Sequence, residues 1–131
     1  MKYLSLFILF IILSCNSAIV QKENKLIGTY ATTKNGQEEI KIYKDKDSFY
    51  LTLKSKGVWE KPATMYIADD SSLLKLFGKD YKNEVKCGLY REGIAVFEVN
   101  QESESVDKQP KYDSEYYLFF VLAGGNIYKL N

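Results

Sequence analysis

The 131-residue sequence contains no histidine, and this absence excludes more functions than any motif includes. A chain without histidine cannot form a His-based catalytic triad, use a histidine general base or hold a metal through imidazole. Arginine is nearly absent as well, since Arg91 is the only one, which disfavours bidentate recognition of phosphate. The 18 basic and 17 acidic residues give a net charge of +1, so no field of one sign predicts a nucleic-acid partner.

Other motifs that carry chemistry are also missing. The sequence has no Gly-rich phosphate loop, no nucleophile elbow and no CxxC pair. The acidic pairs Asp45/Asp47 and Asp69/Asp70 lack the ligand number and the glycine of a calcium loop, so we expect solvated turns there. We therefore predict a protein that is not an enzyme and that needs neither a metal nor a cofactor.

The N-terminus has the pattern of a targeting segment. Lys2 precedes an apolar run at 4–13, which is shorter than the roughly 20 residues that span a bilayer and is typical of a secretory signal peptide. Ile12-Leu13-Ser14-Cys15 resembles the lipobox of bacterial lipoproteins. The resemblance implies cleavage before Cys15, acylation of its thiol by chains such as palmitate, and a lipid-anchored domain facing the periplasm or the exterior of a bacterial envelope. The alternative is an ordinary secretory signal that is cut after Ala18.

These features divide the chain into a signal peptide at 1–14, a flexible tether at 15–24 and a folded domain at 25–131. If Cys15 is acylated, Cys87 has no internal disulfide partner, and we expect it to be a buried structural residue on the same strand face as Val85 and Leu89. Without lipidation, a Cys15–Cys87 disulfide is the competing possibility.

Alternating apolar and polar residues predict a fold made of strands. The expected strands lie at 26–31, 39–44, 49–54, 58–60, 63–68, 85–90, 94–99, 115–122 and 126–130, the last two joined by residues 123–125. The polar composition of residues 101–113 predicts a long exposed loop. The spacing of residues 71–77 predicts a short helix, with a strand as the alternative. Residues 116–121 are apolar on both faces and would promote aggregation at an open edge. We predict an all-β fold, a single antiparallel meander that closes into a barrel of about eight strands with one short helix.

The first expected strand carries Gly28-Thr29-Tyr30, which resembles the opening of lipocalin-like bacterial domains. The resemblance implies that Gly28 lets the chain bend and that Tyr30, in place of the usual Trp, closes one end of a small barrel. It also implies an apolar ligand or a protein partner.

Eleven Tyr, seven Phe and one Trp make aromatic side chains the strongest functional signal. Exposed tyrosines offer rigid contact area to a partner, although tyrosine also suits a half-buried sheet surface. The tentative binding residues are Trp59, Tyr112, Tyr116 and Tyr117, with Glu102 and Glu104 in the loop.

Two functions follow as expectations. The first is a membrane-anchored envelope lipoprotein that binds a protein, a glycan or a small apolar molecule without catalysis. The alternative is a periplasmic inhibitor or immunity protein that neutralises a toxin or a cell-wall enzyme through the 101–113 loop. A purely structural envelope component is a third possibility.

Overall fold

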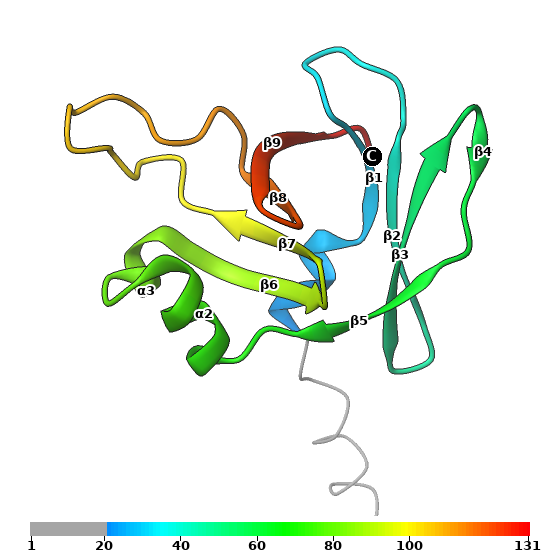
Figure 1. The fold of residues 1–131 in the computed structure, drawn as a ribbon, viewed down its shortest axis with the longest axis horizontal. Helices are drawn as coiled ribbons and strands as arrows, with labels where there is room; N and C mark the ends of the chain where they lie inside the picture. Colours follow the sequence, from blue (N-terminus) through cyan, green and yellow to red (C-terminus); the bar gives the residue numbers. More distant parts are fainter. Residues whose placement is uncertain (1–20) are drawn as a thin grey trace, which may run out of the picture.

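The computed structural model describes residues 21–131, and the expected signal peptide, Cys15 and residues 16–20 of the tether lie outside the described residues. Within this range, nine antiparallel strands form one sheet: β1 (Gly28–Ala31), β2 (Ile40–Asp45), β3 (Ser48–Ser55), β4 (Val58–Trp59), β5 (Ala63–Ile67), β6 (Val85–Arg91), β7 (Ile94–Val99), β8 (Tyr116–Phe120) and β9 (Ala123–Lys129). Because β2 pairs with both β1 and β3, eight strands close into a barrel in the order β2-β1-β9-β8-β7-β6-β5-β3, and β4 is added to β3 (Figure 1). The predicted barrel is confirmed.

Three helical segments accompany the barrel in the described part of the chain: η1 (Lys22–Leu26), α2 (Asp70–Phe77) and α3 (Tyr81–Glu84). The expected helix is α2, and the Asp69 carboxylate caps it by accepting a hydrogen bond from the Ser72 N–H at 2.8 Å. The sequence did not predict the single turn α3. Residues 22–24, expected to belong to a flexible tether, instead begin η1, and the buried Leu26 anchors this helix. No helix within residues 21–131 has the length and apolarity that a membrane crossing requires.

The barrel interior is filled by side chains that alternate inward along the strands. Its buried members are Leu26, Tyr30, Ile40, Ile42, Phe49, Leu51, Met65, Cys87, Leu89, Val96 and Ile127. The Tyr30 hydroxyl donates to the Leu26 carbonyl at 2.5 Å and its ring lies edge-on against Tyr116, so it ties η1 to the barrel. Gly28 is required by a close approach, since a Cβ there would lie 2.3 Å from the Asn131 carbonyl oxygen.

A second apolar core lies outside the barrel, between the outer faces of β6 to β8 and the segments that contain α2, α3 and residues 100–115. Its buried members are Ala68, Leu73, Tyr81, Val85, Ala95, Phe97, Val99 and Tyr112. A β-bulge between Val85 and Cys87 directs Val85 into this core and Cys87 into the barrel, so the expectation that they share one face is wrong. Cys87 is buried, as predicted.

The last hairpin differs from the expected one. The turn is formed by residues 121 and 122, and Gly124 and Gly125 belong to β9 instead of forming the connection. Gly124 is explained by packing, because a Cβ there would lie 2.5 Å from the Tyr117 ring. Val121 adopts a positive φ of 57° in the turn, and its N–H donates to the Gly93 carbonyl at 2.7 Å.

Candidate functional site

The three tyrosines predicted to lie at a binding surface have packing roles. Tyr112 is buried in the second core and donates its hydroxyl proton to the Glu84 carboxylate. Burial, followed by that carboxylate, raises the pKa of Tyr112. Tyr116 packs on Tyr30 inside the barrel, whereas Tyr117 contacts Tyr112 on the outer side, with ring centroids 5.2 Å apart. They therefore do not form one surface patch.

Glu102 and Glu104 are exposed on the connection between β7 and β8. An isolated bridge between Glu104 and Pro110 folds this connection back on itself, and Figure 1 shows it as an arm that projects from the barrel. The structure does not bring these carboxylates into the surface hollow that Trp59 lines.

Tyr112 and Tyr117 border a hollow of about 210 Å³ beside the end of α2. Trp59 borders a larger hollow on the barrel surface. This hollow has a volume of about 500 Å³ and we call it the aromatic groove; it is lined by Lys41, Tyr43, Thr52, Trp59, Glu60 and Pro62. The strand period of two explains its composition, because Ile40 and Ile42 point into the barrel and leave the side chains between and beyond them on the outer face. Thr52 is the register partner of Lys41 on the neighbouring strand.

The aromatic groove has a fixed floor and an extended aromatic side. Thr52 is buried, and its hydroxyl donates to the Glu60 carbonyl at 2.6 Å, which fastens the chain after β4 to β3. The Tyr43 ring stacks on the Tyr50 ring across β2 and β3, with centroids 5.3 Å apart and planes at 20°. These two contacts hold the floor and one side of the aromatic groove in place.

Two ammonium groups lie close to the Trp59 ring. The Nζ atoms of Lys41 and Lys54 lie 5.5 Å and 5.2 Å from the ring centroid, within the range of a cation–π contact. Lys54 also pairs with the Glu38 carboxylate at 3.2 Å. Among residues 21–131, no carboxylate lies within ion-pair distance of the Lys41 ammonium. The groove thus presents one positive charge that an incoming anion can pair with.

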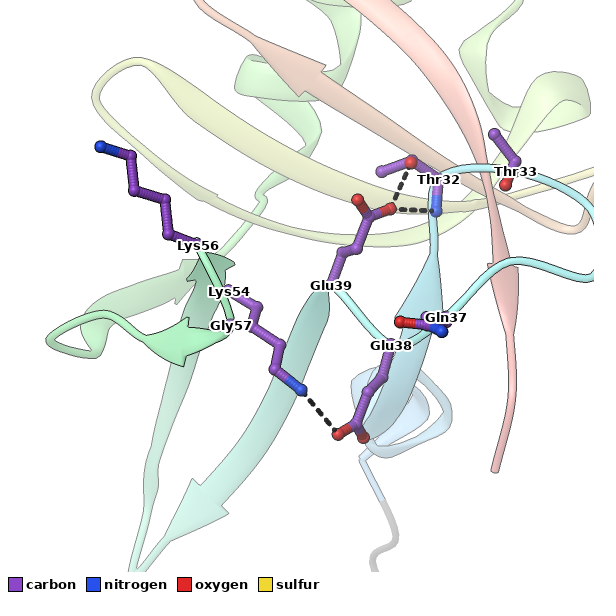
Figure 2. Close-up of a pocket in the computed structure, with 8 residues that line it drawn as sticks. All are labelled: Thr32, Thr33, Gln37, Glu38, Glu39, Lys54, Lys56 and Gly57. Carbon is purple, nitrogen blue, oxygen red and sulfur yellow. Dashed lines mark hydrogen bonds and ion pairs between the residues drawn. The ribbon is translucent and has the colours of Figure 1, made fainter.

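Lys54 also borders a second hollow of about 420 Å³, the polar pocket, which Figure 2 shows between the β1–β2 connection and the β3–β4 hairpin. The Glu39 carboxylate there accepts hydrogen bonds from the hydroxyl and the N–H of Thr32, and these bonds lower the pKa of Glu39. Lys54 pairs with Glu38, whereas Lys56 points away from both carboxylates. Since its carboxylates are engaged with neighbours, the polar pocket is the weaker candidate.

Sequence analysis predicted Trp59 as a binding residue but not the other residues of the aromatic groove. They could have been found from strand alternation, because the outward positions of two adjacent strands are Lys41 and Tyr43 on β2 and Tyr50 and Lys54 on β3, and the register aligns them. Within residues 21–131, no group of three His, Cys, Asp or Glu side chains is placed to hold a metal ion. Comparisons with protein-family models, curated proteins and solved structures gave no significant match, so the site must be interpreted from its own geometry.

Proposed function

We propose that this chain is a membrane-anchored lipoprotein of a bacterial envelope, and that its barrel binds an acidic saccharide chain in the aromatic groove without catalysing a reaction. The observation that carries the proposal is the Trp59 ring in this groove, with the ammonium groups of Lys41 and Lys54 both within cation–π distance of it. The lipobox at Ile12-Leu13-Ser14-Cys15 supports the anchor.

The chemistry of the aromatic groove fits a sugar better than a purely apolar molecule. The C–H face of a pyranose ring packs on aromatic faces such as Trp59 and Tyr43, while its hydroxyl groups need polar partners at the rim of a site. Lys41 and the Glu60 carboxylate are exposed at that rim. A carboxylate on the saccharide adds a charge-assisted contact to the Lys41 ammonium.

The decisive experiment compares acidic and neutral polysaccharides. Calorimetric titration of the full chain in detergent with polygalacturonate should give binding that weakens as salt is added, whereas dextran should bind more weakly. Trp59→Ala removes the central aromatic anchor and should cost about 2 kcal/mol, or roughly 30-fold in affinity. Lys41→Gln should reduce both the affinity for polygalacturonate and its dependence on salt.

Tyr66→Ala is the matched control, because Tyr66 is also an exposed aromatic on the barrel surface but does not line the groove. This variant should bind polygalacturonate like the wild type. Equal affinities of Trp59→Ala and the wild type, or equal binding of dextran and polygalacturonate, would refute the proposed ligand.

The anchor is tested separately. Cys15→Ala should leave an unprocessed precursor, and globomycin, which blocks the lipoprotein signal peptidase, should have the same effect on the wild type. Normal processing and localisation of the Cys15→Ala protein would exclude lipidation, while leaving saccharide binding open to its own test.

A second candidate function, inhibition of an enzyme, is favoured by the projecting arm. Val106 is fully exposed in an arm that also carries Glu102 and Glu104, as an inserting loop requires. The test deletes residues 103–109, because Tyr112 and Ser114 are buried and a longer deletion would damage the fold. An inhibitor would lose its enzyme partner in a pull-down, whereas polygalacturonate binding would persist.

A further inference from the structure

Among the residues that the structure describes, part of β9 has a backbone edge without a neighbouring strand. β9 pairs with β8 from Ala123 to Ile127, but β1 reaches only Tyr128 and Lys129. The reason is that β1 ends at Ala31, where the chain leaves for the β1–β2 connection. The barrel is therefore closed at one end of β9 and open beside residues 123–127.

The register identifies the backbone groups on this edge. The Leu130 N–H donates to the Thr29 carbonyl at 2.8 Å, so the even-numbered residues of β9 direct their N–H and C=O groups away from β8. These residues include Gly124 and Asn126. Among residues 21–131, neither backbone group of these two residues has a hydrogen-bond partner. Two donors and two acceptors consequently face outward in a row.

The side chains of residues 123–126 do not protect this edge. Sheet edges are commonly protected by charges, prolines or bulges, and residues 123–126 include no charged residue and no proline. Gly124 and Gly125 are exposed and place no side chain beside the edge, and a Cβ built on Gly125 would meet no atom within 4 Å. Next to them, Phe120 and Leu122 are 53% and 98% exposed.

We propose that residues 123–127 of β9 bind an extended, uncharged peptide segment of a partner protein by strand addition. Five residues of strand span about 17 Å, which suits a short peptide. A second copy of the chain would have to bring its own short edge, which is held in a barrel, alongside this one. A flexible segment can adapt to the edge, and it can direct an apolar side chain to the Phe120 side of the sheet, opposite Gly125.

The test begins with a displayed library of random heptapeptides selected on the full chain in detergent, followed by anisotropy titration of one enriched, synthesised peptide. Asn126→Pro removes an outward N–H but leaves the hydrogen bonds to β8, and it should weaken peptide binding about tenfold. Asn126→Ala is the matched control. It loses the same side-chain amide, which accepts from the Asp113 N–H at 3.1 Å, but it keeps the backbone N–H and should bind normally.

A second measurement keeps the protein unchanged, in case Asn126→Pro fails to fold. Alternate amides of an extended peptide point to opposite sides, so N-methylating the set that faces β9 should abolish binding. N-methylating the other set should leave binding unchanged. Peptide binding should slow hydrogen exchange of the Gly124 and Asn126 amides. Trp59→Ala should not change peptide binding. Failure to enrich a peptide, loss of binding on N-methylation of either set or of neither, or a dimer that Asn126→Pro disrupts would overturn the proposal.

Discussion

The contact between Gly88 and Phe97 offers a quantitative test of the second core. The two residues are register partners on β6 and β7, and a Cβ on Gly88 would lie 2.4 Å from the Phe97 ring. The ring cannot move aside easily, because it is fully buried between Phe77 and Phe119, with centroid distances of 4.9 Å and 5.9 Å. Gly88→Ala should therefore destabilise the fold through Phe97 itself.

The size and burial of the Phe97 ring set the expected losses. Phe97→Ala removes a buried ring and should cost about 3–5 kcal/mol of unfolding free energy. Gly88→Ala overpacks the same place and should cost about 1–3 kcal/mol. In the double variant the new methyl group occupies part of the space that the ring has left, so the combined loss should be smaller than the sum by at least about 1 kcal/mol.

Urea unfolding followed by circular dichroism measures all four proteins, with linear extrapolation to water. Val106→Ala serves as the control, since Val106 is fully exposed, and it should change stability little. Losses that add within about 0.5 kcal/mol would refute the reasoning, because they would mean that the Gly88 methyl group does not meet the Phe97 ring.

Two further predictions concern the barrel interior and its C-terminal end. Burial, followed by the neighbouring Glu98 carboxylate, raises the pKa of the Cys87 thiol to about 12 from an ordinary 9.0. The unfolded chain therefore loses this proton first, and unfolding free energy should fall above pH 9 by up to about 1.4 kcal/mol per pH unit. Urea titrations between pH 8 and 10.5 should show a shallower fall in Cys87→Ala, and an unchanged fall would contradict the assigned pKa. Gly28→Ala should cost about 1–3 kcal/mol, because the new Cβ meets the Asn131 backbone oxygen. Asn131 also accepts hydrogen bonds from Thr29, so thermal melts should compare chains with and without Gly28→Ala that both lack Asn131, where the cost of the substitution should be smaller. An unchanged cost would show that it arises elsewhere.

The alternation of apolar and polar residues predicted the strands of the barrel, because in a strand with period two the apolar residues mark the face that is buried. Alternation predicted the strands at 39–44 and 49–54, and in the structure Ile40, Ile42 and Leu51 on these strands are buried in the barrel. The pattern failed where the chain changes phase or packs on two sides. The bulge after Val85 inserts one residue without any distinctive sequence, and α3 is a four-residue turn with a single buried side chain, Tyr81.

The second core explains an apolar pattern that was interpreted only in part. β8 is apolar on both faces, which predicted a strand paired on both sides, and it is indeed paired with β7 and β9. Pairing satisfies the backbone hydrogen bonds of β8, but it does not cover the apolar side chains on the outer face of this strand. Its inner side chains pack in the barrel, whereas Tyr117 and Phe119 pack against the second core. Two-sided apolarity therefore indicated a covering layer as well as a closed sheet.

Trp59 could be singled out from sequence as the only tryptophan, whereas the lysines beside its ring could not. Lys41 and Lys54 are separated from it in sequence and reach its ring only through the β2–β3–β4 register. The same limit applies to β9. Gly124 and Gly125 have the composition of a turn, and only their pairing with β8 keeps the chain extended there. An extended, exposed glycine pair leaves the backbone as the main recognition element, which is the feature that strand addition uses.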